Sequence, residues 1–485
     1  MENIKVIAWS LCYIGIVLAV GTIIARINKG SSEISRKFVH IFLGNWVFFT
    51  PFFTKLWPLI IVPLVFIPVN ILSLKHNIIS AMEREDDSLG TVYYPISMLF
   101  LSGAGFLLGW QTLPFIGLLT MAYGDGLAAV VGQKWGRIKA FSFAPDKTLE
   151  GSMMVLLVSF IVTSVCLYVF QGSGTLREVS LPAIIFIAFL TSIVSTFIEL
   201  IGEGGCDNLS LPIGSSLFAT LALQFGSIGL VIYMLVASII LLAAFKLRSI
   251  TPDGMLAAFF TALTLYSLGG VWIAVSLLVF FVLGSLISKI KNDYKIKAES
   301  LQDDSGARNW KQVLANSLPA CIIVWAAYLL PDKNFILLPA FAVFSAAAAD
   351  TFSSEIGMMT KGRVFNILNG KTMPGGLSGG VSFAGLLAGL VGSLLLSTFA
   401  LPQFGSRGFI IIAVLGFLGS ILDSIIGVLL QSKYLGENGQ LQDKKNIRDD
   451  KPVKGLKIMS NNAVNFITLS LIMITGQLFM FFIFK

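Results

Sequence analysis

The chain has 485 residues, of which 55% are hydrophobic and 12% charged, and its formal net charge is +8. A mean hydropathy of +0.84 excludes a soluble globular protein of this size. The four cysteines lie far apart and match neither a zinc-binding nor a disulfide pattern. These properties indicate an integral membrane protein.

Apolar segments follow one another along the whole chain and predict an all-α, polytopic membrane protein. A helix must be about 20 residues long to cross a hydrocarbon layer of about 30 Å. Long segments with almost no charge are 5–25, 92–110, 181–198, 271–288, 377–399 and 463–484. Counting every apolar run between turn signals gives about sixteen transmembrane helices. No small-residue cleavage site follows the first run, which we therefore predict to be an uncleaved helix.

The basic residues fall unevenly on the two sides that this helix count defines. All but six of the 34 Lys and Arg lie on one side; the exceptions are Lys5, Lys55, Arg177, Lys333, Arg407 and Lys485. The positive-inside rule makes the basic side cytoplasmic. Most acidic residues lie there too, although the rule does not govern them. We therefore predict a polar working face on the cytoplasmic side of a bacterial or archaeal cell membrane.

Residues of the same type recur at a nearly constant separation of 224 to 226 positions. The pairs are Arg84/Arg308, Pro95/Pro319, Asp125/Asp350, Arg137/Arg363, Lys147/Lys371 and Gly151/Gly375. Asp207 and Asp423 form a further pair at 216. Eight helices in each half is an even number, so the halves share one orientation. The sequence thus predicts two parallel eight-helix repeats, with domains at 1–246 and 247–485.

Two carboxylates, Asp125 and Asp350, stand in or at the end of apolar helices. A charge at the centre of a bilayer costs about 2.5–3.5 kcal/mol unless it faces a polar cavity. One interpretation is an intramembrane salt bridge. The other is a ligand of Mg²⁺, which binds one or two carboxylates together with phosphate oxygens and water. Asp207 and Asp423 would then supply the second carboxylate of each site.

Lys-Thr pairs at 147–148 and 371–372 precede apolar segments that begin with Gly or Ser. A helix N-terminus beside a lysine can bind phosphate, and Arg137 or Arg363 would add a second cation. A lysine that merely reaches the membrane surface is the alternative. The "GKT" at 370–372 is not a P-loop, because Phe365 stands where that motif requires Gly and no strand is expected before it.

Several stretches together resemble known membrane enzymes. "RKFVHIFLG", "LGTVYYPIS", "GDGLAAVVGQKWGR", "KTLEGS" and "CDNLSLP" are similar to CTP-dependent dolichol, phytol and diacylglycerol kinases, whose relatives include phosphatidate cytidylyltransferases. "ARNWKQVLANS", "ADTFSSEIG", "NGKTMPGGLSGGVS", "LDSIIG" and "NNAVNF" resemble the separate membrane family that contains plant phytyl-phosphate kinase. The two resemblances cover nearly the whole chain.

The resemblance implies two consecutive kinases, which convert an isoprenoid alcohol such as phytol, geranylgeraniol or a polyprenol first to the monophosphate and then to the diphosphate. CTP and Mg²⁺ would bind in the first half to Asp125, Lys134, Arg137, Lys147, Thr148, Glu150, Gly151, Asp207 and Asn208. In the second half, where the donor is CTP or another nucleotide, the matching residues are Asp350, Ser354, Glu355, Arg363, Asn369, Lys371, Thr372, Gly375, Gly376 and Asp423. Further candidates for substrate binding are Arg36, Lys37, Arg84, Arg308, Gln312, Asn316, Asn461, Asn462 and Asn465.

His40 distinguishes the two halves. It lies beside Arg36 and Lys37 at the start of an apolar segment, whereas Thr264 stands 224 residues later. An alcohol must lose a proton during phosphorylation, and a phosphate monoester is already ionised. We therefore predict that His40 assists alcohol phosphorylation in the first half alone. A histidine at the membrane surface with a backbone partner is the alternative.

Two other functions fit parts of the pattern. A cytidylyltransferase would use similar CTP contacts but would leave the nucleotide on the lipid. A transporter can also be a duplicated helical bundle with intramembrane carboxylates, but its polar groups are expected near the midplane. Here they crowd one face, which favours the kinase.

Overall fold

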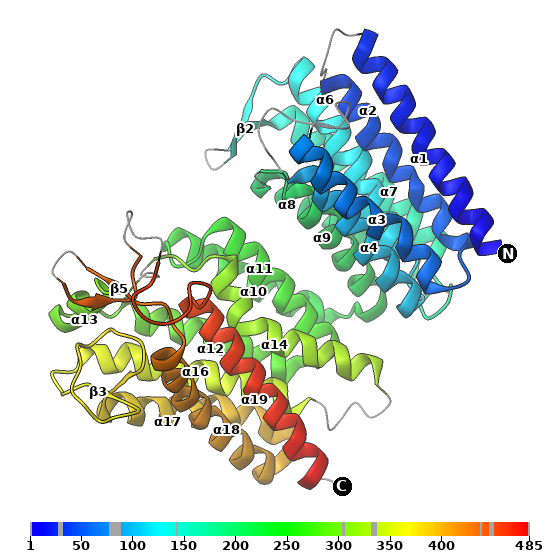
Figure 1. Ribbon diagram of the computed structural model, residues 1–485. Coiled ribbons are helices and arrows are strands. Elements are labelled where there is room, and N and C mark those ends of the chain that lie inside the picture. Colours follow the sequence, from blue (N-terminus) through cyan, green and yellow to red (C-terminus); the bar gives the residue numbers. More distant parts are fainter. Residues whose placement is uncertain are drawn as a thin grey trace. The chain divides into compact units, whose positions relative to one another are not determined.

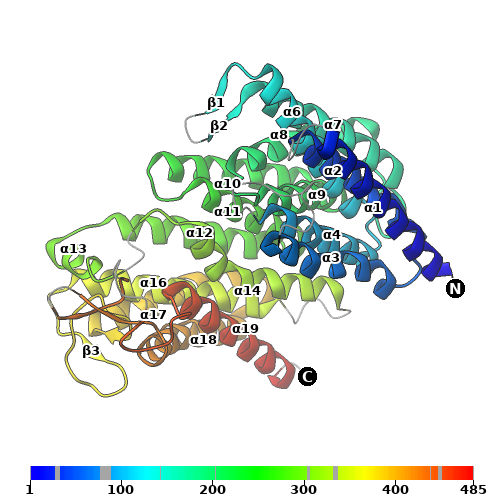
Figure 2. The same ribbon diagram turned by 45° about the horizontal axis from the view of Figure 1, so that its top comes forward.

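The computed structural model describes residues 2–27, 33–76, 89–141, 144–202, 204–302, 306–330, 337–436, 439–445 and 451–483 (Figures 1 and 2). The chain divides into two compact units, Met1–Gly226 and Ser227–Lys485. Our sequence prediction set the border at residue 246 and thus assigned residues 228–246 to the first domain. In the structure, the helix at 228–246 belongs to the second unit. Each unit is described by itself below.

The first unit is a bundle of helices with one short hairpin. Its elements are α1 (Glu2–Ile27), α2 (Glu33–Gly44), the 3₁₀ helix η1 (Asn45–Phe52), α3 (Leu56–His76), α4 (Gly90–Leu108), α5 (Thr112–Leu119), the π-helical turn η2 (Thr120–Asp125), α6 (Gly126–Trp135), β1 (Lys139–Phe141), β2 (Ala144–Thr148), α7 (Leu149–Phe170), α8 (Leu181–Ile201) and α9 (Asp207–Phe225). Helix α9 packs against α4, α5 and α8, and α2 packs against α1 and η2.

The second unit is also helical, with two short hairpins. Its elements are α10 (Ile228–Lys246), α11 (Pro252–Thr264), the π-helical turn η3 (Leu265–Gly269), α12 (Val271–Lys289), α13 (Asp293–Glu299), α14 (Trp310–Leu329), α16 (Leu338–Met359), β3 (Phe365–Asn366), β4 (Gly380–Val381), α17 (Phe383–Ser397), η4 (Thr398–Ala400), α18 (Leu401–Leu429), β5 (Tyr434–Leu435), β6 (Leu441–Gln442) and α19 (Asn461–Ile483). Each hairpin of the chain is a two-stranded antiparallel sheet. Contrary to our expectation, the short strand β3 precedes residues 370–372, but it pairs with β4 in a hairpin and leads into no P-loop helix.

Eleven helical segments within the described residues are long and apolar enough to cross a membrane. The all-α, polytopic membrane fold is therefore confirmed, whereas the count of sixteen spanning helices is not. Helix α16 shows one reason for the difference. It packs against α12, α14, α17, α18 and α19, so most of its surface meets protein and need not be hydrophobic.

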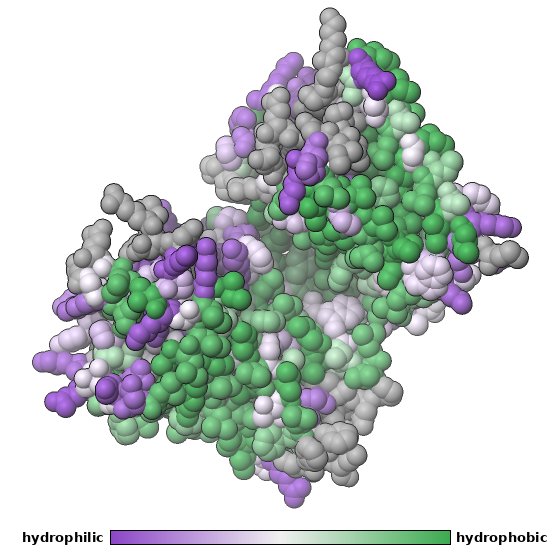
Figure 3. All heavy atoms as spheres, viewed as in Figure 1, coloured by the Kyte–Doolittle hydropathy of each residue, from purple (hydrophilic) through white to green (hydrophobic). Residues whose placement is uncertain are grey.

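The surface carries the apolar side chains that a lipid environment requires. Large hydrophobic residues are exposed along the long helices, among them Ile16 of α1, Ile239 of α10 and Val414 of α18. Figure 3 shows this hydrophobic surface over α17, α18 and α19, with hydrophilic side chains gathered around α13, β3 and β5. Because lipid provides no hydrogen-bond partners, such helices satisfy their backbone groups internally.

Small residues bring the helices around α16 close together. The run Ala346 to Ala349 of α16 is fully or almost fully buried. A Cβ at Gly419 of α18 would lie 2.5 Å from the Cβ of Ala346, and one at Gly392 of α17 would lie 2.9 Å from the carbonyl oxygen of Ala348. Such contacts are typical of helix packing in membranes. They fix the position of Asp350, the residue that follows the alanine run.

Candidate functional site

A pocket in the first unit has apolar walls and a polar end. Its apolar residues come from α1, α2, α3 and α4; they are Ile14, Leu18, Val39, Leu43, Pro63, Phe66, Pro95 and Met98. Its polar residues come mainly from α2, α4, η2 and α9; they are Arg36, Lys37, His40, Asn70, Tyr94, Asp125, Asp207 and Asn208. The structure thus gathers six of the predicted residues at one end of an apolar space.

Asp125 contacts two of the predicted residues, a lysine and a histidine. Its Oδ2 lies 3.1 Å from Nζ of Lys37 and 3.3 Å from Nε2 of His40. All three residues are largely buried, and Asp125 ends the π-helical turn η2. Turns of this kind inside a helix are frequent at functional sites. The salt bridge that we weighed as the alternative for Asp125 is therefore present, at the end of a pocket.

His40 is held through both its ring and its backbone. Its Nε2 lies 3.2 Å from the carbonyl oxygen of Met121, and the hydroxyl of Tyr94 donates to the carbonyl oxygen of His40 at 2.9 Å. The rings of His40 and Tyr94 meet edge to face, with centroids 5.0 Å apart. Burial lowers the pKa of His40 to about 4, although the Asp125 carboxylate opposes this shift. The neutral ring must carry its hydrogen on Nε2, which faces two acceptors, and this leaves Nδ1 as its basic nitrogen.

Lys147 lies between two carboxylates. Its Nζ is 2.5 Å from Oε1 of Glu199 and 3.9 Å from Oδ2 of Asp207. Burial acts to lower the pKa of Lys147, but the Glu199 and Asp207 carboxylates raise it above the ordinary value. Burial, followed by the charge of Asp125, raises the pKa of Asp207. Lys147 is thus a paired cation inside the unit, and not a lysine reaching for the membrane surface.

Our sequence analysis missed Glu199. It is a buried acid near the end of α8, and its Oε2 has no hydrogen-bond partner among the described residues. The signal was present, since Glu199 stands 224 residues before Asp423, the separation found for the other pairs. Glu199 and Asp423 both lie near the end of the helix that precedes the last helix of their unit. The structure therefore favours Glu199, and not Asp207, as the counterpart of Asp423.

The residues after Lys147 shape the backbone. Thr148 caps α7 by accepting a hydrogen bond from the N–H of Gly151 at 3.2 Å, which confirms that the first Lys-Thr pair precedes a helix. Glu150 accepts hydrogen bonds from the N–H groups of Arg137 at 3.0 Å and Ile138 at 3.4 Å. These contacts fix the β1–β2 hairpin against the start of α7. The side chains of Lys134 and Arg137 are exposed nearby.

Asn208 positions the start of α9. Its side-chain amide donates to the carbonyl oxygen of Gly90 at 3.0 Å, and the hydroxyl of Ser97 donates to the Asn208 carbonyl oxygen at 2.6 Å. Both contacts tie α9 to α4 and so fix Asp207, the first residue of α9. Arg84 lies outside the described residues.

The second unit contains a large polar cavity of about 680 Å³. Most of the residues predicted for the second site line it: Arg308, Gln312, Asn316, Asp350, Ser354, Glu355, Gly375, Gly376, Asp423, Asn461, Asn462 and Asn465. They come from α14, α16, α18, α19 and the segment between β3 and β4. The structure thus brings together side chains from all parts of the second unit.

Asp350 and Asp423 differ from Asp125 in their partners. Among the described residues, no cation lies within ion-pair distance of either. The hydroxyl of Thr468 donates to Oδ2 of Asp423 at 3.3 Å. In one orientation of its amide, Asn465 also donates to this oxygen, at 3.2 Å. The second site therefore holds two carboxylates without the basic residues that surround Asp125.

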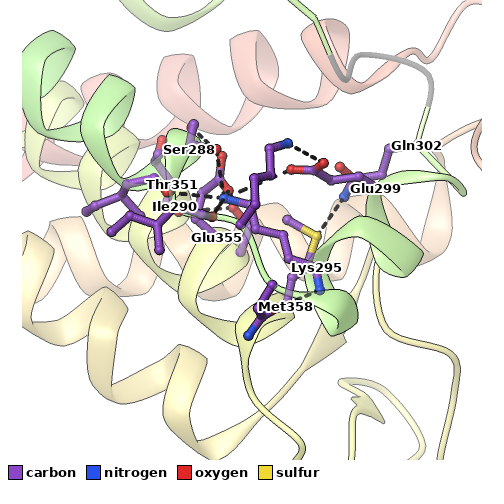
Figure 4. Close-up of polar contacts among 12 residues, drawn as sticks. Ser288, Ile290, Lys295, Glu299, Gln302, Thr351, Glu355 and Met358 are labelled. Carbon is purple, nitrogen blue, oxygen red and sulfur yellow. Dashed lines mark hydrogen bonds and ion pairs between the residues drawn. The ribbon is translucent and has the colours of Figure 1, made fainter.

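A buried lysine forms a network beside this cavity (Figure 4). Nζ of Lys295 donates to the carbonyl oxygens of Ile287 at 3.1 Å, Ser288 at 2.9 Å and Ile290 at 2.9 Å, at the end of α12. It also lies 2.6 Å from Oε2 of Glu355, whose other oxygen accepts from the Ser288 hydroxyl. A cation stabilises the C-terminal end of a helix. The sequence analysis did not identify Lys295, which stands in the charged run "KNDYKIKAES".

Four predicted residues of the second half do not line the cavity. Arg363 lies exposed just before β3, and Asn369, Lys371 and Thr372 lie exposed on the segment between β3 and β4. Our expectation that the second Lys-Thr pair opens a helix is wrong. Helix α17 begins at Phe383, and Ser382 caps it by accepting from the N–H of Gly385 at 3.1 Å. The glycines after Thr372 let the chain turn back toward β4 before the helix starts.

Asp125, Asp207 and Glu199 are the residues of the first unit that would hold a magnesium ion, if phosphate oxygens and water completed its shell. No group of three or more His, Cys, Asp and Glu side chains suitable for a metal occurs in the described part of the chain. Mg²⁺ needs only one or two carboxylates when phosphate oxygens and waters complete its shell. Asp125 and Asp207 line one pocket, and the Glu199 oxygen without a partner lies close by, against the same lysine as Asp207.

Comparisons with known proteins identify related sequences. The family described as integral membrane protein DUF92 matches residues 235–473. The phytol kinase of Synechocystis is 34% identical over 209 residues, which are 43% of this chain and 87% of that protein. A probable chloroplastic phytol kinase 1 of Glycine max is 32% identical over 221 residues, 42% of this chain and 69% of its own. Protein PGR of Arabidopsis thaliana is 28% identical over 276 residues, 50% and 93% of the two chains. No solved structure matches this chain.

Proposed function

We propose that this chain, which belongs to the family of integral membrane proteins that includes the phytol kinases, transfers a phosphate group from a nucleotide to the hydroxyl of an isoprenoid alcohol. One observation carries the proposal: the apolar pocket of the first unit ends at the contact between His40 and Asp125. Such a pocket suits a molecule with a long hydrocarbon chain and a single polar end.

The residues at the polar end have distinct roles in this proposal. The hydrocarbon chain lies between α1, α3 and α4, and the hydroxyl lies at His40. Nδ1 of His40 accepts the proton that the hydroxyl loses as its oxygen attacks the terminal phosphorus of the nucleotide, and the bond from that phosphorus to the departing nucleoside diphosphate breaks. Lys37 and Lys147 stabilise the charge on the transferring phosphate. Tyr94 and the Met121 carbonyl keep the imidazole in place.

We propose CTP as the donor, in line with the resemblance of the first half. Asp125 and Asp207 would hold a magnesium ion, which supplies positive charge to the phosphate oxygens. A cytidylyltransferase remains the second candidate, because it would bind the same nucleotide. A histidine able to take a proton from a neutral alcohol favours the kinase, since an acceptor that is already ionised needs no base.

The second unit, in this proposal, phosphorylates the product again. Its helices follow the order of the first, with α14, α16, α17, α18 and α19 in the places of α4, α5 to α6, α7, α8 and α9. Three helix contacts also recur. In the first unit they are α7–α8, α8–α9 and α4–α9; in the second they are α17–α18, α18–α19 and α14–α19, in the same order. This agreement supports an internal duplication. We place both sites at the basic, cytoplasmic face.

The test uses full-length protein in lipid nanodiscs with phytol or geranylgeraniol, Mg²⁺ and CTP labelled at either the γ- or the α-phosphate. We expect the γ-label on the lipid, first in the monophosphate and then in the diphosphate. Transfer of the α-label with release of pyrophosphate would identify a cytidylyltransferase and overturn the kinase proposal. Asp125→Asn should leave the alcohol unreacted, and Asp350→Asn should stop at the monophosphate. ATP, GTP and UTP in parallel reactions test the choice of CTP.

A further inference from the structure

Arg308 stands at the junction of two spaces in the second unit. It lines the large polar cavity and also a smaller pocket with apolar walls, formed mainly by α10, α11 and α12. Phe280, Gln312 and Asn316 line both spaces as well. Any molecule that occupied the apolar pocket and the cavity together would therefore pass these four residues.

The backbone of Arg308 is fixed at both polar atoms. Its N–H donates to the carbonyl oxygen of Ser249 at 3.0 Å, and its carbonyl oxygen accepts from the N–H of Thr251 at 3.0 Å. The Thr251 hydroxyl donates to the same oxygen at 3.1 Å. Arg308 thus has a defined position just before α14, whose first residue is Trp310.

The guanidinium group is also held in place. Its Cζ lies 6.0 Å from the ring centroid of Phe280 and 5.6 Å from that of Phe281. It passes over Gly284 of α12, where a Cβ would lie 2.9 Å from Nη2 of Arg308. Aromatic faces attract a guanidinium without using its hydrogen-bond donors. Within the described residues, the side-chain donors of Arg308 therefore stay available to a ligand.

No carboxylate in the described part of the chain forms an ion pair with Arg308. The acidic residue whose charge acts on Arg308 is Glu355. Glu355 already forms an ion pair with Lys295 and accepts a hydrogen bond from the Ser288 hydroxyl. A cation placed away from bulk water without an anion is costly. An anionic ligand removes that cost, and a guanidinium suits the oxygens of a phosphate.

The polar residues of α14 extend this position along one face of the helix. Gln312 and Asn316 are four residues apart and share a side of α14, and they line both spaces together with Arg308, which precedes the helix. Gln312 Oε1 accepts from the N–H of Asn309, which leaves its NH₂ group as a donor. In our proposal the acceptor of the first half is a neutral alcohol. That half has Val92 at the position that corresponds to Asn316, 224 residues earlier.

We propose that Arg308, Gln312 and Asn316 bind the phosphate of a lipid monophosphate acceptor, whose hydrocarbon chain enters the apolar pocket. Because the first half has Arg84 at the position of Arg308, the choice of a phosphorylated lipid over an alcohol falls to Asn316, where the first half has Val92. This inference rests on the proposed function of the second unit, and it adds the place and the residue by which that unit chooses its substrate.

The experiment measures lipid binding apart from catalysis. Full-length protein in nanodiscs is titrated with phytyl monophosphate, phytol, inorganic phosphate and CTP, each alone, for the wild type, Arg308→Gln and Arg248→Gln. Arg248 lines the polar cavity but not the apolar pocket, so its variant controls for the loss of one positive charge. Arg308→Gln should weaken phytyl monophosphate binding about tenfold or more, with phytol and CTP binding unchanged and Arg248→Gln close to the wild type.

Three results would overturn the inference. The first is binding of phytyl monophosphate by Arg308→Gln that equals the wild type. The second is an equal loss of CTP binding, and the third is a loss of inorganic phosphate binding without loss of the lipid. Asn316→Val, which introduces the residue of the first half, covers the case of a misfolded Arg308 variant and should also weaken lipid phosphate binding. If the wild type binds phytyl monophosphate through Arg308 but no nucleotide phosphorylates it, the proposed function fails and the binding site stands.

Discussion

Lys147 and Glu199 form an ion pair, with 2.5 Å between Nζ and Oε1, that joins the β1–β2 hairpin to the buried end of α8. Lys147 was predicted from a motif, and Glu199 lies 52 residues further along the chain. The pair holds the ammonium group near Asp207, at the polar end of the pocket. Glu199 therefore positions a residue that we assign to phosphate binding.

We expect Glu199→Gln to slow the first phosphorylation by about 100-fold, because misplacement of a catalytic group by about 1 Å can cost that much. The second phosphorylation, started from the monophosphate, should be unchanged. Initial rates with labelled nucleotide measure both steps. Glu178→Gln is the matched control, since Glu178 is an exposed acid that lies before α8 and outside the pocket. Equal slowing by both variants would contradict the role of Glu199.

His40→Ala should lower alcohol phosphorylation by about 10²- to 10⁴-fold, the usual contribution of a general base. Phosphorylation of the monophosphate should continue, because that acceptor is already ionised and Thr264 stands at the corresponding place. Separate assays with phytol and with phytyl monophosphate measure the two steps. An equal loss of both activities would show that His40 supports the fold and not the first reaction.

Lys295→Met should strongly destabilise the second unit. The substitution keeps the length of the side chain but leaves three carbonyl oxygens of α12 and the Glu355 carboxylate without their cation. Removing one partner of a buried ion pair costs about 3–5 kcal/mol. Thermal unfolding in detergent measures the change. Lys291→Met, which removes the more exposed pair with Glu299, should cost at most about 1 kcal/mol. Similar effects of the two variants would contradict the structural role of Lys295.

Ser382→Ala should destabilise α17 by about 1 kcal/mol, the usual cost of losing an N-cap. Thr372→Ala should have little effect on stability, because Thr372 is exposed and lies well before the helix. Thermal unfolding of the two variants compares the positions directly. Greater destabilisation by Thr372→Ala would mean that α17 begins earlier than the structure places it.

The sequence was informative where polar residues interrupt apolar segments. Asp125 and His40 stood out for this reason, and the structure brings them together. Lys295 could not be found in this way, because it lies in a charged run that is typical of a solvated loop. The packing of α13 against α16 and against the end of α12 buries it. The Lys-Thr pairs show a similar limit: the two sequences look alike, but only Thr148 caps a helix.

The number of spanning helices is harder to predict. Hydropathy detects helices that face lipid, and a helix that other helices enclose, such as α16, does not reach the hydropathy of a membrane span. Helix α16 contains Asp350, Ser354 and Glu355, and its neighbours provide the surroundings that these polar groups need. Its central place, and not its hydropathy, defines it as the helix around which the second unit is built.

The π-helical turn at residues 120–125 makes the rotational register of one helix essential to the first site. A π turn contains one residue more than the α-helical turn that it replaces, and each residue turns an α-helix by about 100°. Deleting one residue from this turn would leave α5 and α6 apolar and long enough to span the membrane. It would rotate Asp125 away from Lys37 and His40, so insertion into the bilayer and assembly of the site are separate properties of the same helix.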